Sequence, residues 1–169
     1  MKGNTKYLFA LMDDETRYWI AQEVANTKQD HDARGLFREG KKIAGKVPAR
    51  LITDGLGSYA NAYRDEFATA PFPKTEHIRE IALDGVIHNN KMERMNGEFR
   101  DREKVMRGVK SVTTQTLTGY QVFHNFIRPH LALEGKTPAE ACGIIVNGEN
   151  KWKTLIENAS QKDAKAKSL

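Results

Sequence analysis

Runs and alternations of apolar residues divide the chain into strand-length and helix-length segments. Residues 7–12 (YLFALM) form a continuous apolar run, and residues 18–24 follow a short polar turn with aromatic and β-branched side chains. Two such runs around a polar turn predict a β-hairpin. Further strands are expected over residues 50–53, a short run before Asp-Gly, and over residues 77–83, where apolar positions alternate.

Helical periodicity accounts for most of the other apolar positions. Helices are predicted where apolar residues recur every three or four positions, over residues 33–43, 58–67, 89–107, 114–127 and 152–159. Ser58 is expected to cap the second helix, and the Thr-Pro-Ala-Glu run at residues 137–140 to begin a short helix with proline in its first turn. A hairpin, then alternating strand and helix, then helices alone predict an α/β sheet layered with helices.

The predicted helix over residues 89–107 has two faces of different chemistry. One face carries apolar side chains at helical spacing: Met92, Met95, Phe99 and Met106. The opposite face carries one carboxylate followed by amide and cationic groups three or four residues apart: Glu93, Asn96, Arg100, Lys104 and Arg107. A carboxylate at the head of such a row suits the binding of a metal ion beside a phosphate backbone.

A second acid, Asp54, follows the predicted strand at residues 50–53 and precedes Gly55. In α/β folds, functional groups gather just past the carboxyl ends of strands. Taken singly, Asp54 is more often a turn residue and Glu93 a solvated surface residue. Together, two carboxylates from distant positions provide the hard oxygen ligands that Mg²⁺ prefers. Asp54 and Glu93 are therefore the candidate catalytic and metal-binding residues, and phosphodiester chemistry is the leading hypothesis.

Composition adds a weak preference for a polyanionic partner. The formal net charge is +5, and residues 91–110 contain seven Lys or Arg against four acids. Cys142 is the only cysteine, so neither an internal disulfide nor a cysteine-cluster zinc site is expected, and its neighbours indicate a helix-packing residue. Trp19 and Trp152 are expected to anchor the core. No apolar run approaches the ~18 residues of a membrane span, and a cytoplasmic protein is expected by default.

Four motifs occur in a recognisable order: TDGLGSY at residues 53–59, HNNKMERMN at 88–96, FHNFIRPH at 123–130 and GKTPAE at 135–140. On these motifs the chain resembles the integrase-core catalytic domain of insertion-sequence transposases of the DDE type, from about Lys2 to Gly143. An aspartate, a later glutamate and a basic residue seven positions after that glutamate (Arg100) are fairly specific to this family.

The resemblance implies a ribonuclease H-like fold, a mixed sheet flanked by helices, over residues 1–143, with a C-terminal helix and basic tail over residues 144–169. In the family, two aspartates and a glutamate bind two Mg²⁺ (or Mn²⁺) ions and drive DNA strand cleavage and strand transfer. By position, Asp54 corresponds to the second acid and Glu93 to the third.

The resemblance also implies DNA as the partner, both element ends and target, and a homo-oligomer when the protein is full length. Contacts to DNA are expected from residues on or beside the predicted 89–107 helix: Arg100, Lys104, Arg107, Asn89 and Asn96.

The first acid of the set has no clear counterpart. In the resembled fold it lies on strand one, before the hairpin, whereas Asp13 and Asp14 fall in the turn after strand two. We therefore expect the first acid to precede Met1, together with the central strand of a sheet ordered 3-2-1-4-5. Residues 7–12 and 50–53 then lack the neighbour that hydrogen-bonds to both. We expect an N-terminally incomplete domain with weak or no strand-transfer activity.

Two other functions remain open on the sequence. One is a non-catalytic DNA-binding or subunit-association module derived from a transposase. The other is a basic α/β domain that binds nucleic acid by charge alone, in which substitution of Asp54 leaves binding and the response to metal unchanged.

Overall fold

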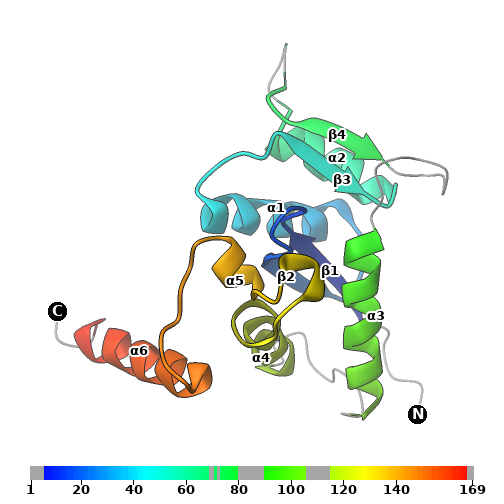
Figure 1. Ribbon diagram of the computed structural model, residues 1–169. Coiled ribbons are helices and arrows are strands. Elements are labelled where there is room, and N and C mark those ends of the chain that lie inside the picture. Colours follow the sequence, from blue (N-terminus) through cyan, green and yellow to red (C-terminus); the bar gives the residue numbers. More distant parts are fainter. Residues whose placement is uncertain (1–5, 69–70, 72, 80–89, 106–114, 167–169) are drawn as a thin grey trace.

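The computed structural model describes residues 6–68, 71, 73–79, 90–105 and 115–166. The strands found in them are β1 (Tyr7–Met12), β2 (Trp19–Ala25), β3 (Arg50–Thr53) and β4 (Glu76–Arg79) (Figure 1). The α-helices are α1 (Asp30–Ala44), α2 (Gly57–Glu66), α3 (Asn90–Val105), α4 (Gln115–Val122), α5 (Pro138–Ala141) and α6 (Lys151–Ala166). A π-helical segment, Phe123–Ile127, continues α4, and a 3₁₀ turn follows at Leu131–Leu133.

β1 and β2 form the predicted hairpin. They pair antiparallel, with Tyr7 opposite Ala25 at the open end. In the turn, the Asp13 carboxylate accepts hydrogen bonds from the Thr16 N–H at 2.9 Å and from the Thr16 hydroxyl at 2.6 Å. Arg17 takes a left-handed conformation there, with φ of 59°. The Asp13 side chain therefore has a structural role in reversing the chain.

Different helices cover the two faces of the hairpin (Figure 1). α1 packs on one face, in a core that contains Phe9 and Phe37. α3 and α4 pack on the other face, around Trp19, Met95 and Phe99. Trp19 is fully buried, which confirms it as a core anchor. Because side chains of β1 contribute to both cores, both faces of this strand are covered.

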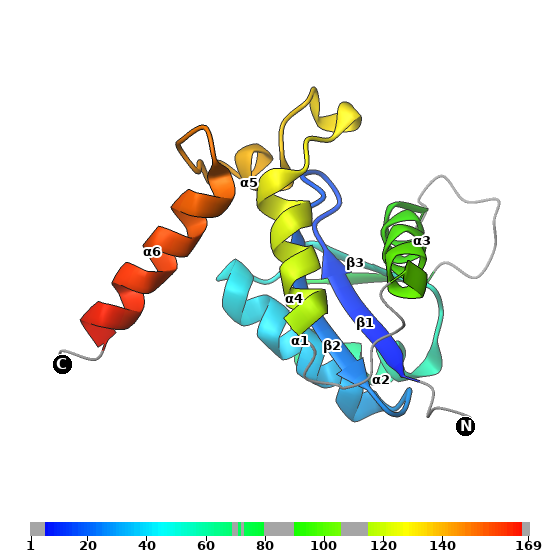
Figure 2. The same cartoon turned by 90° about the horizontal axis from the view of Figure 1, so that it is seen from below.

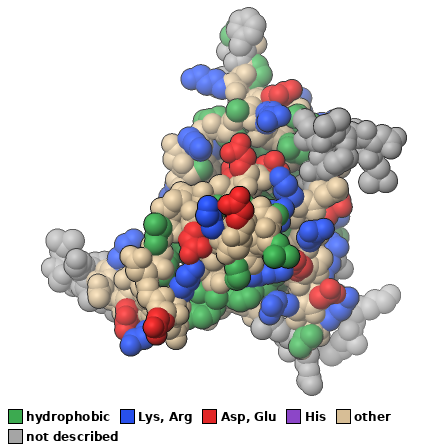
Figure 3. Space-filling model, viewed as in Figure 1, with side chains coloured by type: hydrophobic (Ala, Val, Ile, Leu, Met, Phe, Trp, Pro, Cys, Tyr) green, Lys and Arg blue, Asp and Glu red, His purple; other side chains and the backbone are tan. Residues whose placement is uncertain are grey.

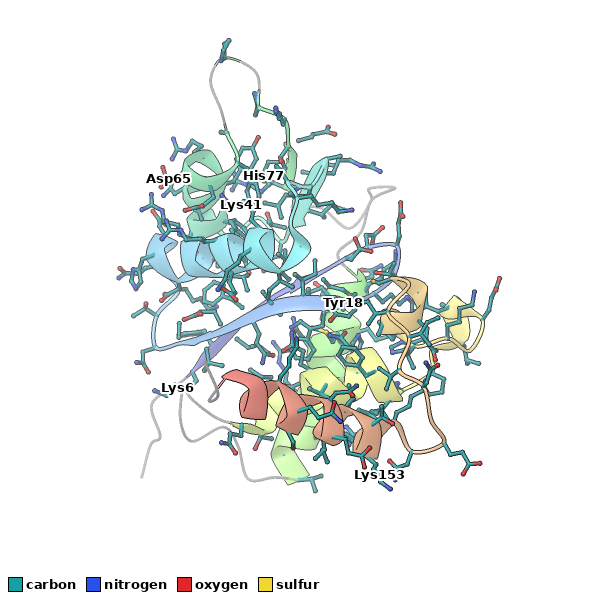
Figure 4. The ribbon with its side chains drawn as sticks, turned by 90° about the vertical axis from the view of Figure 1, so that its left-hand side faces the viewer. Lys6, Tyr18, Lys41, Asp65, His77 and Lys153 are labelled. Atoms are coloured by element: carbon teal, nitrogen blue, oxygen red, sulfur yellow. The ribbon has the colours of Figure 1, made fainter. Side chains whose placement is uncertain are left out.

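In Figure 1, β3, β4 and α2 lie above α1 and the hairpin. β3 and β4 pair in parallel along their whole length. In Figure 4, Lys41 points from α1 toward α2, where its Nζ donates to the Glu66 carboxylate at 2.7 Å. The His77 ring of β4 packs on Tyr63 of α2 with centroids 4.6 Å apart. The described residues thus form two separate two-stranded sheets, β1–β2 and β3–β4.

Local capping explains where two of the helices begin and end. At the start of α1, the buried Asp32 carboxylate accepts the Gln29 N–H at 3.0 Å, and Gly45 ends the helix with φ of 64°. At the start of α5, the Glu140 N–H donates to the Thr137 hydroxyl, while the Glu140 carboxylate accepts the Thr137 N–H. This reciprocal pair, with proline at the first helical position, confirms the predicted start of the short helix.

Three local predictions are wrong. Ser58 does not cap α2: the helix begins at Gly57 after Leu56, and the Ser58 hydroxyl is buried within it. Cys142 is exposed because α5 ends at Ala141, before the cysteine can pack against a neighbour. Trp152 is 41% exposed because α6 is directed away from the rest of the chain (Figure 2).

Some expectations reach beyond what the structure describes. The strand predicted over residues 77–83 is present from Glu76 to Arg79, and the remainder of that range lies outside the described residues. Met106 of the predicted apolar stripe also lies outside them. Among the described residues, no helix combines the length and the apolar character that a membrane crossing requires.

Candidate active site

A groove of about 1130 Å³ separates β1 from β3. All residues of both strands line it, together with the C-terminal half of α1 and one side of α3 from Asn90 to Arg100. From α3 the lining residues are Asn90, Lys91, Met92, Asn96, Phe99 and Arg100. The groove therefore brings together the end of β3 and the helix that the sequence singled out.

Asp54 is the first residue after β3, lines this groove and is exposed. Its Oδ1 accepts the Leu56 N–H at 3.1 Å, which fixes the turn into α2. Burial, and to a smaller extent the charge of Asp54, raise the pKa of the Tyr59 phenol above its ordinary value. The carboxylate is thus held in place by the turn while remaining open to solvent.

Glu93 lies in the first turn of α3 and is exposed. It is not among the residues that line the groove, although Asn90, Asn96 and Arg100, which lie three or seven positions from it, are. Its carboxylate benefits from the positive end of the helix dipole. Asp54 therefore lies on the groove, whereas Glu93 lies outside its lining, on the helix that borders it.

Asn96 and Arg100 have the environments expected of residues that meet a ligand. The Oδ1 atom of Asn96 is buried and has no hydrogen-bond partner among the described residues. Arg100 lines the groove, is exposed, and makes no ion pair with a described residue. Lys104 is exposed and pairs with Asp101 at 3.0 Å, a surface contact of small energy. Asn89 and Arg107 lie outside the described residues.

Three acids of the hairpin turn also line the groove: Glu15 is exposed, whereas Asp13 and Asp14 already have partners. Asp13 accepts two hydrogen bonds from Thr16, as described above. Lys91 of α3 donates from its Nζ to the Asp14 carboxylate at 2.8 Å and to the Asp14 carbonyl at 2.9 Å. These contacts join the hairpin turn to the first turn of α3. Within the part of the chain that the structure describes, no three His, Cys, Asp or Glu side chains are arranged to hold a metal ion.

Charge is not concentrated over the face shown in Figure 3, where basic and acidic side chains are interspersed. The net charge of +5 therefore does not mark a DNA-binding surface on this face. The polar side of α3 is the more specific candidate.

The FHNFIRPH motif has a structural role that sequence reasoning missed. Asn125 is 2% exposed, and its amide both accepts the Trp19 N–H at 2.8 Å and donates to the Trp19 carbonyl at 2.9 Å. His124 hydrogen-bonds through Nε2 to the Arg17 carbonyl at 3.0 Å. Arg128 forms a two-bond ion pair with Glu98 of α3. The motif therefore holds the hairpin turn, β2 and α3 against one another.

Comparison with known proteins gives one clear result. The family model for the DDE domain of IS240 transposases matches residues 1–130. No curated protein and no solved structure matches the chain. Because the family model covers more than half of the sequence, this chain belongs to the DDE-domain family of insertion-sequence transposases.

Proposed function

We propose that this chain is the catalytic core, or part of it, for metal-dependent DNA strand cleavage and strand transfer during transposition. Asp54 and Glu93 are its metal-binding carboxylates. The observation that carries the proposal is the position of Asp54: an exposed carboxylate at the carboxyl end of a parallel strand, on a groove that α3 also lines. Family membership supports the same reaction class.

The donor atoms suit a hard divalent cation. Asp54 uses only Oδ1 in a described hydrogen bond, and Glu93 makes no ion pair or hydrogen bond with a described residue. The unpartnered Oδ1 of Asn96 adds a neutral oxygen on the same helix. These are carboxylate and amide oxygens, the ligands that Mg²⁺ and Mn²⁺ prefer. A bound pair of such ions activates the attacking oxygen and stabilises the leaving oxygen of a phosphodiester.

The residues of the chain have separate tasks in this scheme. The Asp54 carboxylate on the groove and the Glu93 carboxylate on α3 would hold the cations. Arg100, exposed on the groove, binds a DNA phosphate, and Lys104 does so after exchanging its weak contact with Asp101. Arg107 and Asn89, which lie outside the described residues, are proposed as DNA contacts by their position in the family motif.

We further propose that these 169 residues alone have weak or no strand-transfer activity. The carboxylates of Asp13 and Asp14 are engaged by Thr16 and Lys91, and among the residues described no three His, Cys, Asp or Glu side chains are arranged to hold a metal ion. Robust Mg²⁺-dependent cleavage of element ends by the purified chain would refute this part of the proposal.

Metal binding provides the direct test. Mn²⁺ affinity, measured by electron paramagnetic resonance, is expected to fall in Asp54→Asn and in Glu93→Gln by at least the roughly 10–100-fold that loss of an outer-shell partner costs. Asp101→Asn is the matched control, because it removes an exposed carboxylate from the same helix. Unchanged Mn²⁺ affinity in Asp54→Asn would show that this residue is not a ligand.

DNA binding provides a second test. Arg100→Ala is expected to weaken binding of a DNA duplex and to reduce the slope of log K against log salt concentration by about 1, as for the loss of one phosphate contact. Lys153→Ala on α6 is the control for an exposed cation far from the groove. Equal effects of the two substitutions would favour binding by overall charge.

A non-catalytic DNA-binding or subunit-association module is the second candidate function. The lack of a three-acid cluster among the described residues favours it. It predicts Arg100-dependent DNA binding with no contribution from Mn²⁺ or from Asp54.

A further inference from the structure

α6 is held at its first turn and then runs away from the rest of the chain (Figure 2). At that turn, Lys151 donates from its Nζ to the Glu140 carboxylate of α5 at 2.6 Å. The Thr154 hydroxyl donates to the Asn147 carbonyl at 2.9 Å. Beyond Thr154, no hydrogen bond or ion pair among the described residues joins α6 to another element. Helices of about 15 residues are marginal in water on their own, so packing against a partner would stabilise this one.

The first half of α6 carries apolar side chains along one side. These residues, which we call the α6 stripe, recur at helical spacing: Trp152, Leu155, Ile156 and Ala159. Trp152, Ile156 and Ala159 are exposed, and Leu155 is half-buried. An exposed tryptophan beside an exposed isoleucine is typical of the anchor residues of protein interfaces. The stripe therefore has the composition of a contact surface that lacks its partner.

The α6 stripe is complementary to itself in size. Its midpoint lies between Leu155 and Ile156. A second copy of the helix, packed antiparallel with a two-fold axis at this midpoint, places Trp152 opposite Ala159 and Leu155 opposite Ile156. The largest side chain then meets the smallest at both ends of the contact, which lets two helices pack closely. Such a dimer is closed, because both copies use the same surface.

Charged groups beside the α6 stripe follow the same symmetry. Glu149 and Lys162 lie equally far from its midpoint, one before it and the other after it. Both are exposed, and neither has an ion-pair partner among the described residues. The other described charged side chains of α6 are already paired. An antiparallel pair of helices therefore directs the free cation of each copy toward the free carboxylate of the other.

We propose that the α6 stripe is a dimerisation surface, and that its partner is the α6 stripe of a second copy of this chain, packed antiparallel. The surface lies after residue 130, where the family match ends, and none of its residues lines the groove. The proposal is therefore independent of the nuclease function. A stripe of this length buries less than the roughly 800 Å² per partner of a stable interface, so the dimer should be weak and dissociate on dilution.

A lipid surface fits the α6 stripe less well than a second copy does. A helix that lies in a membrane interface carries apolar side chains along its length. In α6 the four residues after the stripe, 160–163, are all polar. The match of large with small side chains and of opposite charges about one midpoint has no use on a fluid lipid surface, whereas it favours a two-fold dimer.

Sedimentation equilibrium of the intact chain, in EDTA and without DNA, tests the surface. The average mass should rise from monomer toward dimer between about 5 and 500 µM. W152A/I156A replaces two exposed side chains, so it should keep the circular dichroism spectrum and weaken association at least about tenfold. Leu131→Ala is the matched control: Leu131 is 98% exposed but lies outside the α6 stripe, so association should be unchanged.

Charge exchange tests the antiparallel arrangement. Glu149→Lys alone, or Lys162→Glu alone, places like charges opposite each other and should weaken association about threefold or more at low salt. E149K/K162E restores opposite charges across the dimer and should recover the original affinity. In a parallel pair, residue 149 would face residue 149 and residue 162 would face residue 162, so neither single substitution would change the balance of charge.

Four results would each overturn the proposal. The chain could remain monomeric at about 500 µM. It could form a dimer that W152A/I156A does not weaken, which would place the interface elsewhere on the chain. E149K/K162E could fail to recover the affinity lost in the single variants. Finally, a monomeric chain could sediment with vesicles of anionic lipid and lose this property in W152A/I156A, which would assign the stripe to a membrane surface.

Discussion

Replacing Asn125 with alanine should reveal how much the stability of the hairpin depends on one buried amide. The Asn125 side chain makes two hydrogen bonds to the backbone of Trp19, at 2.8 Å to its N–H and at 2.9 Å to its carbonyl. Gln121 also donates to the Trp19 carbonyl at 2.9 Å, so alanine at position 125 leaves that carbonyl with a partner. The Trp19 N–H, in contrast, loses the partner that it has among the described residues.

The expected loss follows from these two different outcomes. An unsatisfied buried donor costs about 1–3 kcal/mol, and the loss of a bond to a carbonyl that keeps a second partner costs about 0.5–1.5 kcal/mol. Asn125→Ala should therefore lower the free energy of unfolding by about 2–4 kcal/mol. Gln121→Ala removes only a bond to the Trp19 carbonyl, which keeps Asn125 as a partner, and should lower the free energy of unfolding by about 0.5–1.5 kcal/mol.

Urea denaturation followed by circular dichroism and tryptophan fluorescence measures both variants. The prediction requires a lower midpoint for Asn125→Ala than for Gln121→Ala, at a similar dependence of free energy on urea. Equal losses in the two variants, or a loss below about 0.5 kcal/mol for Asn125→Ala, would show that the Trp19 backbone does not depend on this amide.

Three further predictions concern α1, α5 and the histidine pair. Gly45→Ala should lower the free energy of unfolding by about 1 kcal/mol, because residue 45 has φ of 64°. Gly35 is exposed, and a Cβ added there has open space around it, so Gly35→Ala should raise the free energy of unfolding by about 0.5–1 kcal/mol. Urea denaturation measures both variants. Thr137→Ala removes the α5 cap and should lower the thermal midpoint, at a cost of about 1 kcal/mol. Burial, and then the neighbouring His124 and Arg128, lower the pKa of His130 to about 4. In the unfolded chain the pKa of His130 is near 6.5, so between about pH 4 and 6.5 the unfolded state binds more protons than the folded state. The free energy of unfolding should therefore fall as pH decreases from about 6.5 to 4. His130→Gln should make this fall smaller, as measured by urea titrations at successive pH values.

The local elements were largely predictable because their signals are local. The apolar run of β1 and the Thr-Pro-Ala-Glu start of α5 each specify one conformation, and both occur where expected. The exposure of Trp152 was not predictable. The spacing of apolar residues over residues 152–159 indicates that α6 has an apolar side, but it does not indicate whether another element packs against that side. The division into two sheets likewise depends on which strands meet in space.

The candidate site was only partly predictable for the same reason. The position of Asp54 follows from an apolar run that ends at an acid before glycine, so its place after β3 could be expected. Helical spacing correctly put Glu93 on a polar side of α3. The role of Asn125 could not be read from its position, because an asparagine within a helical pattern does not indicate which backbone it contacts.

The groove also determines how firmly the two candidate acids are placed relative to each other. Glu93 moves with α3, which packs on the hairpin through Met95 and Phe99 and is tied to the hairpin turn by Lys91. Asp54 moves with β3, whose buried Leu51 belongs to the core on the other side, under α1. No ladder joins β1 to β3 among the described residues, so the separation of the carboxylates depends on packing through α1 rather than on backbone hydrogen bonds.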